Sequence, residues 1–254
     1  MVLEGDQLLP ERERLIVALD VGDEAAALAL VDRLAEEVSC FKVGLQLFTA
    51  CGPSIVKRLW ERGARVFLDL KLHDIPNTVA HAIDSCMQQG VFLIDVHATG
   101  GRAMLTAAAE SAREGAARKG VLPPKIIGVT LLTHLHAKDF PDIGLSSEGD
   151  DVVTPHVVRL SRLCQECGLD GVVASSQEVK AIREETGPGF LIVTPGIRPA
   201  GGELHDQTRV ATPARALRAG ASYLVVGRPI TAAADPKDAA RQIIREMEDA
   251  FLIA

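Results

Sequence analysis

The strongest constraint on the fold of this chain is a regular alternation between short apolar runs and longer segments with helical spacing. Most of the short runs are continuously apolar, which is typical of parallel strands that are covered on both faces. The runs that predict strands are Leu15–Leu19, Cys40–Val43, Arg65–Leu70, Phe92–Val96, Ile126–Thr130, Gly171–Ala174, Leu191–Thr194 and Tyr223–Val226. Strand–helix repeats of this number predict a closed barrel.

Segments between these strands carry the spacing of amphipathic helices, and several end in a glycine that can terminate a helix. Examples are Glu24–Val38, Ser54–Arg62, Val79–Gln89, Gly101–Lys119 and Ala214–Ala219, with candidate stops at Gly63, Gly90, Gly120 and Gly220. An open doubly wound sheet is the alternative, but the G-x-G-x-x-G motif of its dinucleotide-binding members is absent. We therefore expect an α/β fold, a single (β/α)8 TIM barrel over residues 14–254, after a polar tail at residues 1–13.

Composition restricts the partners of this barrel. A net charge of −7 argues against a nucleic-acid surface, although a few local cations can still bind a small anion. The longest apolar runs fall short of a membrane span, and the polar, acidic start does not look like a secretory signal, so we expect a cytoplasmic protein. Cys164 and Cys167 form a lone C-x-x-C pair, and without further ligands we expect no metal site and no cofactor.

Charged residues interrupt the predicted strands where such barrels carry their chemistry. Asp20 follows the first strand, where it could also cap the next helix. Lys42 lies inside the apolar second strand and requires an acidic partner, even if that pair is only structural. Asp69 and Lys71 are two residues apart on the third strand and should share a face. Asp74 could bring a second carboxylate to the same ammonium, unless this cluster is a solvated loop.

A phosphate site is expected at the loops that follow strands seven and eight, which often bind phosphate in this fold. The seventh strand leads into Pro195-Gly196-Ile197-Arg198, and the eighth leads into Gly227-Arg228-Pro229. Glycine allows backbone N–H groups to approach an anion, and arginine offers a planar, bidentate fork. The two loops together predict a phosphate-binding pair, Arg198 and Arg228.

Longer motifs surround these residues. The most specific is Asp69-Leu70-Lys71-Leu72-His73-Asp74-Ile75-Pro76-Asn77-Thr78, and others are Phe41-Lys42-Val43-Gly44, Val96-His97-Ala98, Gly128-Val129-Thr130-Leu131-Leu132-Thr133, Val193-Thr194-Pro195-Gly196-Ile197-Arg198 and Asp206-Gln207. Over most of its length, the chain resembles the orotidine 5'-phosphate decarboxylase family. That resemblance implies conversion of orotidine 5'-monophosphate to UMP and CO₂, the last step of de novo pyrimidine nucleotide synthesis, without metal or cofactor.

The resemblance also implies roles for individual residues. Lys71 would be the proton donor in an alternating Asp-Lys-Asp-Lys network, with Asp69 and Asp74 as the other catalytic residues. The implied substrate-binding set is Asp20, Lys42, Asp69, Lys71, Asp74, Ile75, Thr78, Thr133, Arg198, Gln207, Gly227 and Arg228. In this set Asp20 and Lys42 hold ribose hydroxyls, and Thr133 lies at the pyrimidine. The phosphate is bound by Gln207, Gly227 and Arg228. The family is typically a homodimer in which Asp74 and Thr78 reach into the partner's site.

Two other functions remain open. A magnesium-dependent sugar-phosphate decarboxylase or synthase of the same barrel group shares the D-x-K-x-x-D pattern. Its second strand carries an acidic metal ligand, whereas this chain has Lys42, a cation that repels Mg²⁺. A non-catalytic barrel that binds nucleotides is the second alternative, because fold alone does not fix function.

Overall fold

Eight parallel strands close into a barrel in the computed structural model, which describes residues 10–87, 90–146, 151–199 and 211–252. Each strand pairs with the next in sequence, and the last pairs with the first, as predicted. The strands are β1 (Leu15–Ala18), β2 (Cys40–Gly44), β3 (Arg65–Leu72), β4 (Val91–His97), β5 (Lys125–Val129), β6 (Gly171–Val173), β7 (Leu191–Thr194) and β8 (Tyr223–Val226). The single (β/α)8 TIM barrel is thereby confirmed.

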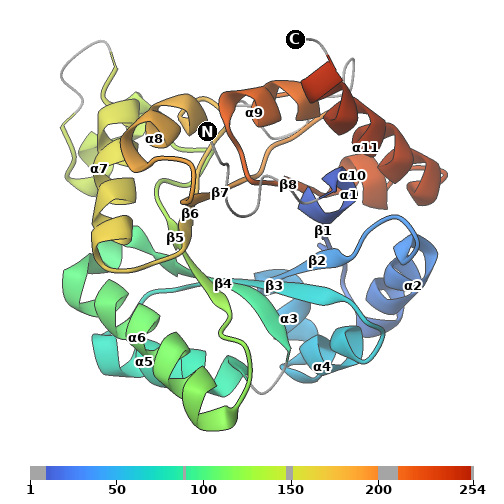
Figure 1. Ribbon diagram of the computed structural model, residues 1–254, viewed down its shortest axis with the longest axis horizontal. Coiled ribbons are helices and arrows are strands. Elements are labelled where there is room, and N and C mark those ends of the chain that lie inside the picture. Colours follow the sequence, from blue (N-terminus) through green and yellow to red (C-terminus); the bar gives the residue numbers. More distant parts are fainter. Residues whose placement is uncertain (1–9, 88–89, 147–150, 200–210, 253–254) are drawn as a thin grey trace.

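Helices form a ring around the strands (Figure 1). They are α1 (Glu11–Arg14), α2 (Glu24–Leu34), α3 (Leu45–Cys51), α4 (Ser54–Trp60), α5 (Pro76–Cys86), η3 (Ala98–Gly100), α6 (Gly101–Lys119), η4 (Ala137–Asp139), η5 (Pro141–Ile143), α7 (Val153–Glu166), α8 (Val179–Thr186), α9 (Pro213–Ala219), α10 (Arg228–Thr231) and α11 (Pro236–Leu252). The end of α6 is as expected, at the left-handed Gly120. α5 begins three residues earlier than Val79, because Pro76 occupies its first turn, a position that suits proline.

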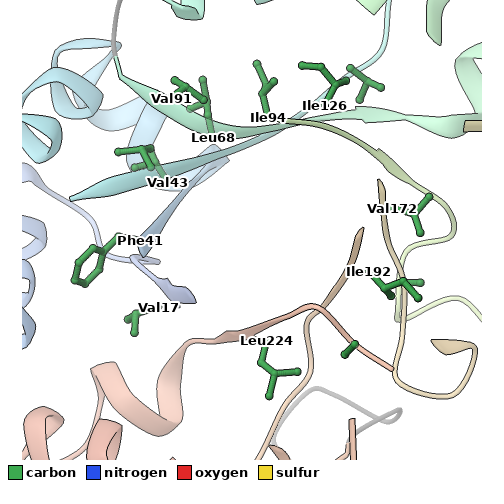
Figure 2. Close-up of a cluster of buried hydrophobic side chains, with 14 of the residues drawn as sticks. Val17, Phe41, Val43, Leu68, Val91, Ile94, Ile126, Val172, Ile192 and Leu224 are labelled. Carbon is green, nitrogen blue, oxygen red and sulfur yellow. The ribbon is translucent and has the colours of Figure 1, made fainter. Parts of the chain in front are cut away.

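The hydrophobic core has two layers, because side chains along a strand point alternately to opposite faces. Val17 and Phe41 belong to the outer layer, which packs between the strands and the helices (Figure 2). Ile16, Cys40 and Phe67 belong to the inner layer, which fills the barrel. A barrel of this size is therefore packed along its axis and is not an open channel.

The same alternation decides which residues reach the mouth of the barrel. In or just after each of the first four strands, a charged residue follows an inner-layer residue by two positions. These charged residues are, in order, Asp20, Lys42, Asp69 and Asp95. Because the period of a strand is two residues, these positions continue the inward face. Polar side chains thus follow the apolar interior at the carboxyl ends of the strands.

At the opposite end of the barrel, two arginines donate hydrogen bonds to backbone carbonyl groups. Arg14 is buried and donates to the carbonyls of Ala221 (2.7 Å) and Ser222 (3.0 Å), just before β8. Arg183 of α8 donates to the carbonyls of Phe190 (2.7 Å) and Gly220 (2.8 Å). These two guanidinium groups stabilise the fold, and the charged residues of the cavity lie at the other end of the barrel.

None of the helices in the described ranges combines the length and the apolar character that a membrane crossing requires.

Candidate active site

A cavity of about 530 Å³ opens at the carboxyl ends of the strands. This volume is typical of pockets that bind small molecules. Its polar lining comes from both sides of the barrel, and it comprises Asp20, Lys42, Gln46, Asp69, Lys71, Thr133, Arg198 and Arg228. Its apolar lining comprises Ala18, Phe67, Val129, Leu131, Leu132, Val173, Pro195 and Val225. The sequence-predicted residues Asp20, Lys42, Asp69, Lys71, Thr133, Arg198, Gly227 and Arg228 are therefore brought together.

The charged residues form a row of alternating sign across the floor of this cavity. The Nζ atom of Lys42 lies 3.1 Å from Oδ1 of Asp20 and 3.1 Å from Oδ2 of Asp69. The other oxygen of Asp69 accepts a hydrogen bond from the ammonium of Lys71. Asp20 does not cap the following helix, since Asp23 does so through a 2.8 Å bond from the Ala26 N–H. The alternative role as a cap is thus wrong for Asp20.

The partners of Lys42 and Asp69 determine their protonation. Burial by itself would lower the pKa of Lys42, whose side chain is only 12% exposed, but the carboxylates of Asp69 and Asp20 raise it above the usual range. Burial would likewise raise the pKa of Asp69, but Lys42, a hydrogen bond from Asp95 and the Lys71 ammonium lower it. Both groups are therefore charged at neutral pH, and each depends on the other.

A distortion of β3 sets the position of Lys71. The pairing of β3 with β4 shifts between Leu68 and Leu72: these two residues lie opposite Ile94 and Val96, so β3 contains extra residues. Within this bulge, Lys71 adopts a left-handed backbone with φ 51°, the sole non-glycine residue in the described ranges with positive φ. The predicted contact between Lys71 and Asp69 is present. We expected the regular alternation of side chains along β3 to create it, but the bulge creates it instead. Bulges commonly re-aim side chains beside functional sites.

Our sequence analysis missed Gln46 in the cavity lining and, with greater consequence for the site, Asp95 of β4. Its side chain is completely buried, and its Oδ1 accepts a 2.7 Å hydrogen bond from the backbone N–H of Lys71. Burial raises the pKa of Asp95 well above its usual range, and the nearby Asp69 carboxylate adds to this effect. The available signal was an acidic residue inside the apolar run Phe92–Val96, the same signal that identified Lys42.

Arginines occupy the other side of the cavity, where β7 and β8 end. Arg198 is buried, and its Nη1 donates to the Ile197 carbonyl at 2.9 Å, while its Nε has no partner among the described residues. Burial lowers the pKa of Arg198, and the neighbouring positive charge of Arg228 lowers it further. Two like charges that converge on one cavity are suited to an anionic ligand.

Three predicted residues lie outside the cavity of this chain, and one cannot be placed. Asp74 is exposed, and its Oδ1 accepts a 2.6 Å bond from the N–H of Ile75, itself 67% exposed. Thr78 is exposed in the first turn of α5. No ion pair between Asp74 and Lys71 occurs within the described part of the chain. Gln207 falls outside the described residues.

Among the described residues, no group of three or more His, Cys, Asp or Glu side chains is arranged to hold a metal ion. Cys164 and Cys167 are free and buried in and just after α7, and burial raises the pKa of the Cys164 thiol to about 12. At the cavity floor, the Lys42 ammonium fills the space between Asp20 and Asp69, where two carboxylates could otherwise share a cation.

The fold and the cavity define a class: a (β/α)8 barrel whose charged, ligand-sized site lies where enzymes of this fold carry their chemistry. Residues 13–243 match the model of the orotidine 5'-phosphate decarboxylase / HUMPS family. The match spans most of the sequence, and the chain belongs to this family.

Individual relatives agree with the family match. The chain is 55% identical over 238 residues to an orotidine 5'-phosphate decarboxylase from Moorella thermoacetica, which covers 93% of each chain. It is 48% identical over 239 residues to one from Syntrophomonas wolfei, with 94% of this chain and 99% of the relative covered. A crystal structure of the enzyme from Lactobacillus acidophilus superposes with a TM-score of 0.79 at 36% identity, covering 92% of this chain and 99% of that chain.

The buried ion pair of Lys42 leads to a prediction about stability and pH. Lys42→Met should lower the free energy of unfolding at pH 7 by about 3 kcal/mol, because the buried Asp69 loses a counter-charge. The pKa of Asp69 is lowered by folding, so its stabilisation is present above its unfolded pKa, about 4, and is lost as the pH falls through the folded value. The deficit of the variant should therefore shrink in acid. Urea denaturation at neutral and acidic pH measures both quantities.

Lys57→Met is the matched control, because Lys57 pairs with Glu61 on the exposed surface of α4. That pair should contribute at most about 0.5 kcal/mol. A deficit for Lys42→Met that is equally small, or that stays constant with pH, would contradict the assigned electrostatics.

Proposed function

We propose that this chain is an orotidine 5'-phosphate decarboxylase, which converts orotidine 5'-monophosphate to UMP and CO₂. The observation that carries the proposal is the ion pair of Lys71 with Asp69, in a cavity that Arg198 and Arg228 also line. An ammonium at one side and two guanidiniums at the other fit a substrate with a carboxylate and a phosphate. Relatives of the chain that bear this name support the same conclusion.

The reaction needs electrostatic help because its intermediate is poorly stabilised. The bond between carbon 6 of the pyrimidine and its carboxyl group breaks, CO₂ leaves, and the electron pair stays on carbon 6. The ammonium of Lys71 stabilises that negative charge and then transfers a proton from Nζ to carbon 6. Asp69 holds the ammonium and places negative charge against the departing carboxylate, a repulsion that ends when CO₂ leaves.

The remaining residues bind the parts of the nucleotide that do not react. Asp20 and Lys42 bind ribose hydroxyls, and Thr133 contacts the pyrimidine. Arg228, the Gly227 backbone and Gln207 grip the phosphate, while Arg198 belongs to the loop that closes over it. Binding energy from the distant phosphate offsets the repulsion at the reacting carboxylate. No metal ion and no cofactor takes part in this mechanism.

The active form in this proposal is a cytoplasmic homodimer in which Asp74, Ile75 and Thr78 complete the partner's site. These residues support it by their position, since they are exposed at the mouth of the barrel without lining the cavity of their own chain. Neither nucleic acid nor membrane is a partner.

Mixed dimers test whether Asp74 acts across the interface. Lys71→Ala and Asp74→Ala chains should each be nearly inactive as homodimers. After refolding together, the mixed dimer contains one site with Lys71 from one chain and Asp74 from the other, so activity should reappear. If the mixture stays as inactive as its parents, Asp74 acts within its own chain.

Lys71→Ala tests the central role. Turnover should fall by at least about 10⁴-fold, because the variant loses both the stabilising charge and the proton donor. UMP should still bind, since the phosphate contacts remain. A spectrophotometric assay with orotidine 5'-monophosphate, with and without EDTA, gives the rate and separates the proposal from a magnesium-dependent reaction. Near-normal turnover of the variant, or loss of wild-type turnover in EDTA, would overturn the proposal.

Arg228→Ala tests the phosphate site. KM for orotidine 5'-monophosphate should rise by about 100-fold or more, the effect of about 3 kcal/mol from a charged hydrogen bond. The control is orotidine, which lacks the phosphate: the variant and the wild type should decarboxylate it at the same slow rate. An unchanged KM would place the phosphate elsewhere.

A further inference from the structure

Asp95 is an acidic residue in the middle of an apolar strand. Its neighbours Ile94 and Val96 are fully buried, and its own side chain has no exposed surface. An ionised carboxylate in such a place is costly unless it is paired. Asp95 has no ion pair of its own with a Lys or Arg among the described residues. Some other interaction must therefore stabilise its buried carboxyl group.

The two oxygens of Asp95 are satisfied differently. Oδ1 accepts the 2.7 Å hydrogen bond from the Lys71 N–H. Oδ2 is buried, and no N–H or O–H group of the described residues donates to it. Burial raises the pKa of Asp95, and Asp69 lies close enough for its negative charge, and a hydrogen bond between the two side chains, to raise that pKa further. Two carboxyl groups can share a hydrogen bond only if one of them carries the proton.

The surrounding charges decide which carboxyl group is protonated. Asp69 is paired with both Lys42 and Lys71, which favour its ionised form. Asp95 is more deeply buried, and an ionised Asp69 stands beside it, so the pKa of Asp95 is raised and that of Asp69 is lowered. With Asp95 neutral, the charges of Asp20, Lys42, Asp69 and Lys71 also balance. A fifth, negative charge would be buried without compensation.

Asp95 also stands opposite the bulge that places Lys71. The left-handed backbone of Lys71, with φ 51°, costs a lysine about 1 kcal/mol or more. The bulge removes the Lys71 N–H from the regular pairing of β3 with β4, and the Asp95 carboxyl accepts it instead. One side chain therefore bonds the backbone of Lys71 and lies beside the carboxylate of Asp69.

We propose that Asp95 is a positioning residue of the active site, which holds Lys71 and Asp69 in their reactive arrangement as an un-ionised carboxylic acid. This inference rests on the proposed function, because it assigns the two residues their roles. Asp95 does not line the cavity, and it acts through its neighbours only. Its oxygen fixes the bulge, and its proton fixes the orientation of Asp69.

The neutral form makes a specific prediction, because asparagine has the same shape and can make both bonds. In Asp95→Asn, the amide oxygen accepts from Lys71 and the NH₂ donates to Asp69. Its kcat should stay within about threefold of the wild type, whereas Asp95→Ala should lose about 100-fold in kcat, the usual cost of misplacing a reacting group. KM and the binding of UMP should change little in either variant.

Asp170 provides the matched control at the other end of the barrel. Its Oδ2 accepts a 2.8 Å hydrogen bond from the Ile126 N–H of β5, much as Asp95 accepts from Lys71, but it does not line the cavity. Asp170→Ala should lower thermal stability and leave kcat unchanged. A general loss of activity through instability would therefore appear in both alanine variants.

Infrared spectroscopy tests the proton directly and does not depend on turnover. The wild type at neutral pH should show the carbonyl band of a buried protonated carboxyl group, and Asp95→Asn should lack it. The inference is overturned if that band is missing, if Asp95→Asn loses as much kcat as Asp95→Ala, or if Asp95→Ala keeps full kcat. A wild type without activity toward orotidine 5'-monophosphate would instead refute the proposed function, while the band would still report on Asp95.

Discussion

The buried carboxylate of Asp69 is the interaction on which the site depends. It receives an ammonium on each oxygen, from Lys42 at 3.1 Å and from Lys71, and the carboxyl group of Asp95 is near enough to influence its pKa. None of these groups is stable alone in an apolar barrel. Each buried charge is stable only because its neighbours in the row carry the opposite charge, so the row behaves as one unit. The strands of the barrel keep its members at fixed distances.

The barrel separates two electrostatic tasks along the cavity. Strands β1 to β4 supply the row of alternating charges, and the segments after β7 and β8 supply the arginines. Because β7 and β8 lie opposite β3 and β4 in the closed barrel, a ligand must span the mouth of the barrel to reach both Lys71 and the arginines. A nucleotide has the required anion at one end and a ring at the other, which is the physical basis for the proposed substrate.

The bulge in β3 shows how a small backbone irregularity can shape a site. A regular strand would continue its pairing with β4, and the Lys71 N–H would then join the ladder. The extra residues release that N–H to Asp95 and turn the lysine into a left-handed conformation. Strain of this kind persists only where the surroundings hold it, and it is concentrated at functional sites.

The sequence by itself determined the barrel, its strand order and most of the polar residues that line the cavity. Period-two burial and the placement of charges at strand ends are local patterns, and motifs such as Asp69-x-Lys71 and Gly227-Arg228 lie within them. The tertiary structure alone decided the bulge at Lys71, the hydrogen bonds of Asp95, and the position of Asp74 outside its own chain's cavity. These features depend on the register between neighbouring strands and on which groups meet in space, and neither is written in the spacing of residues along one chain.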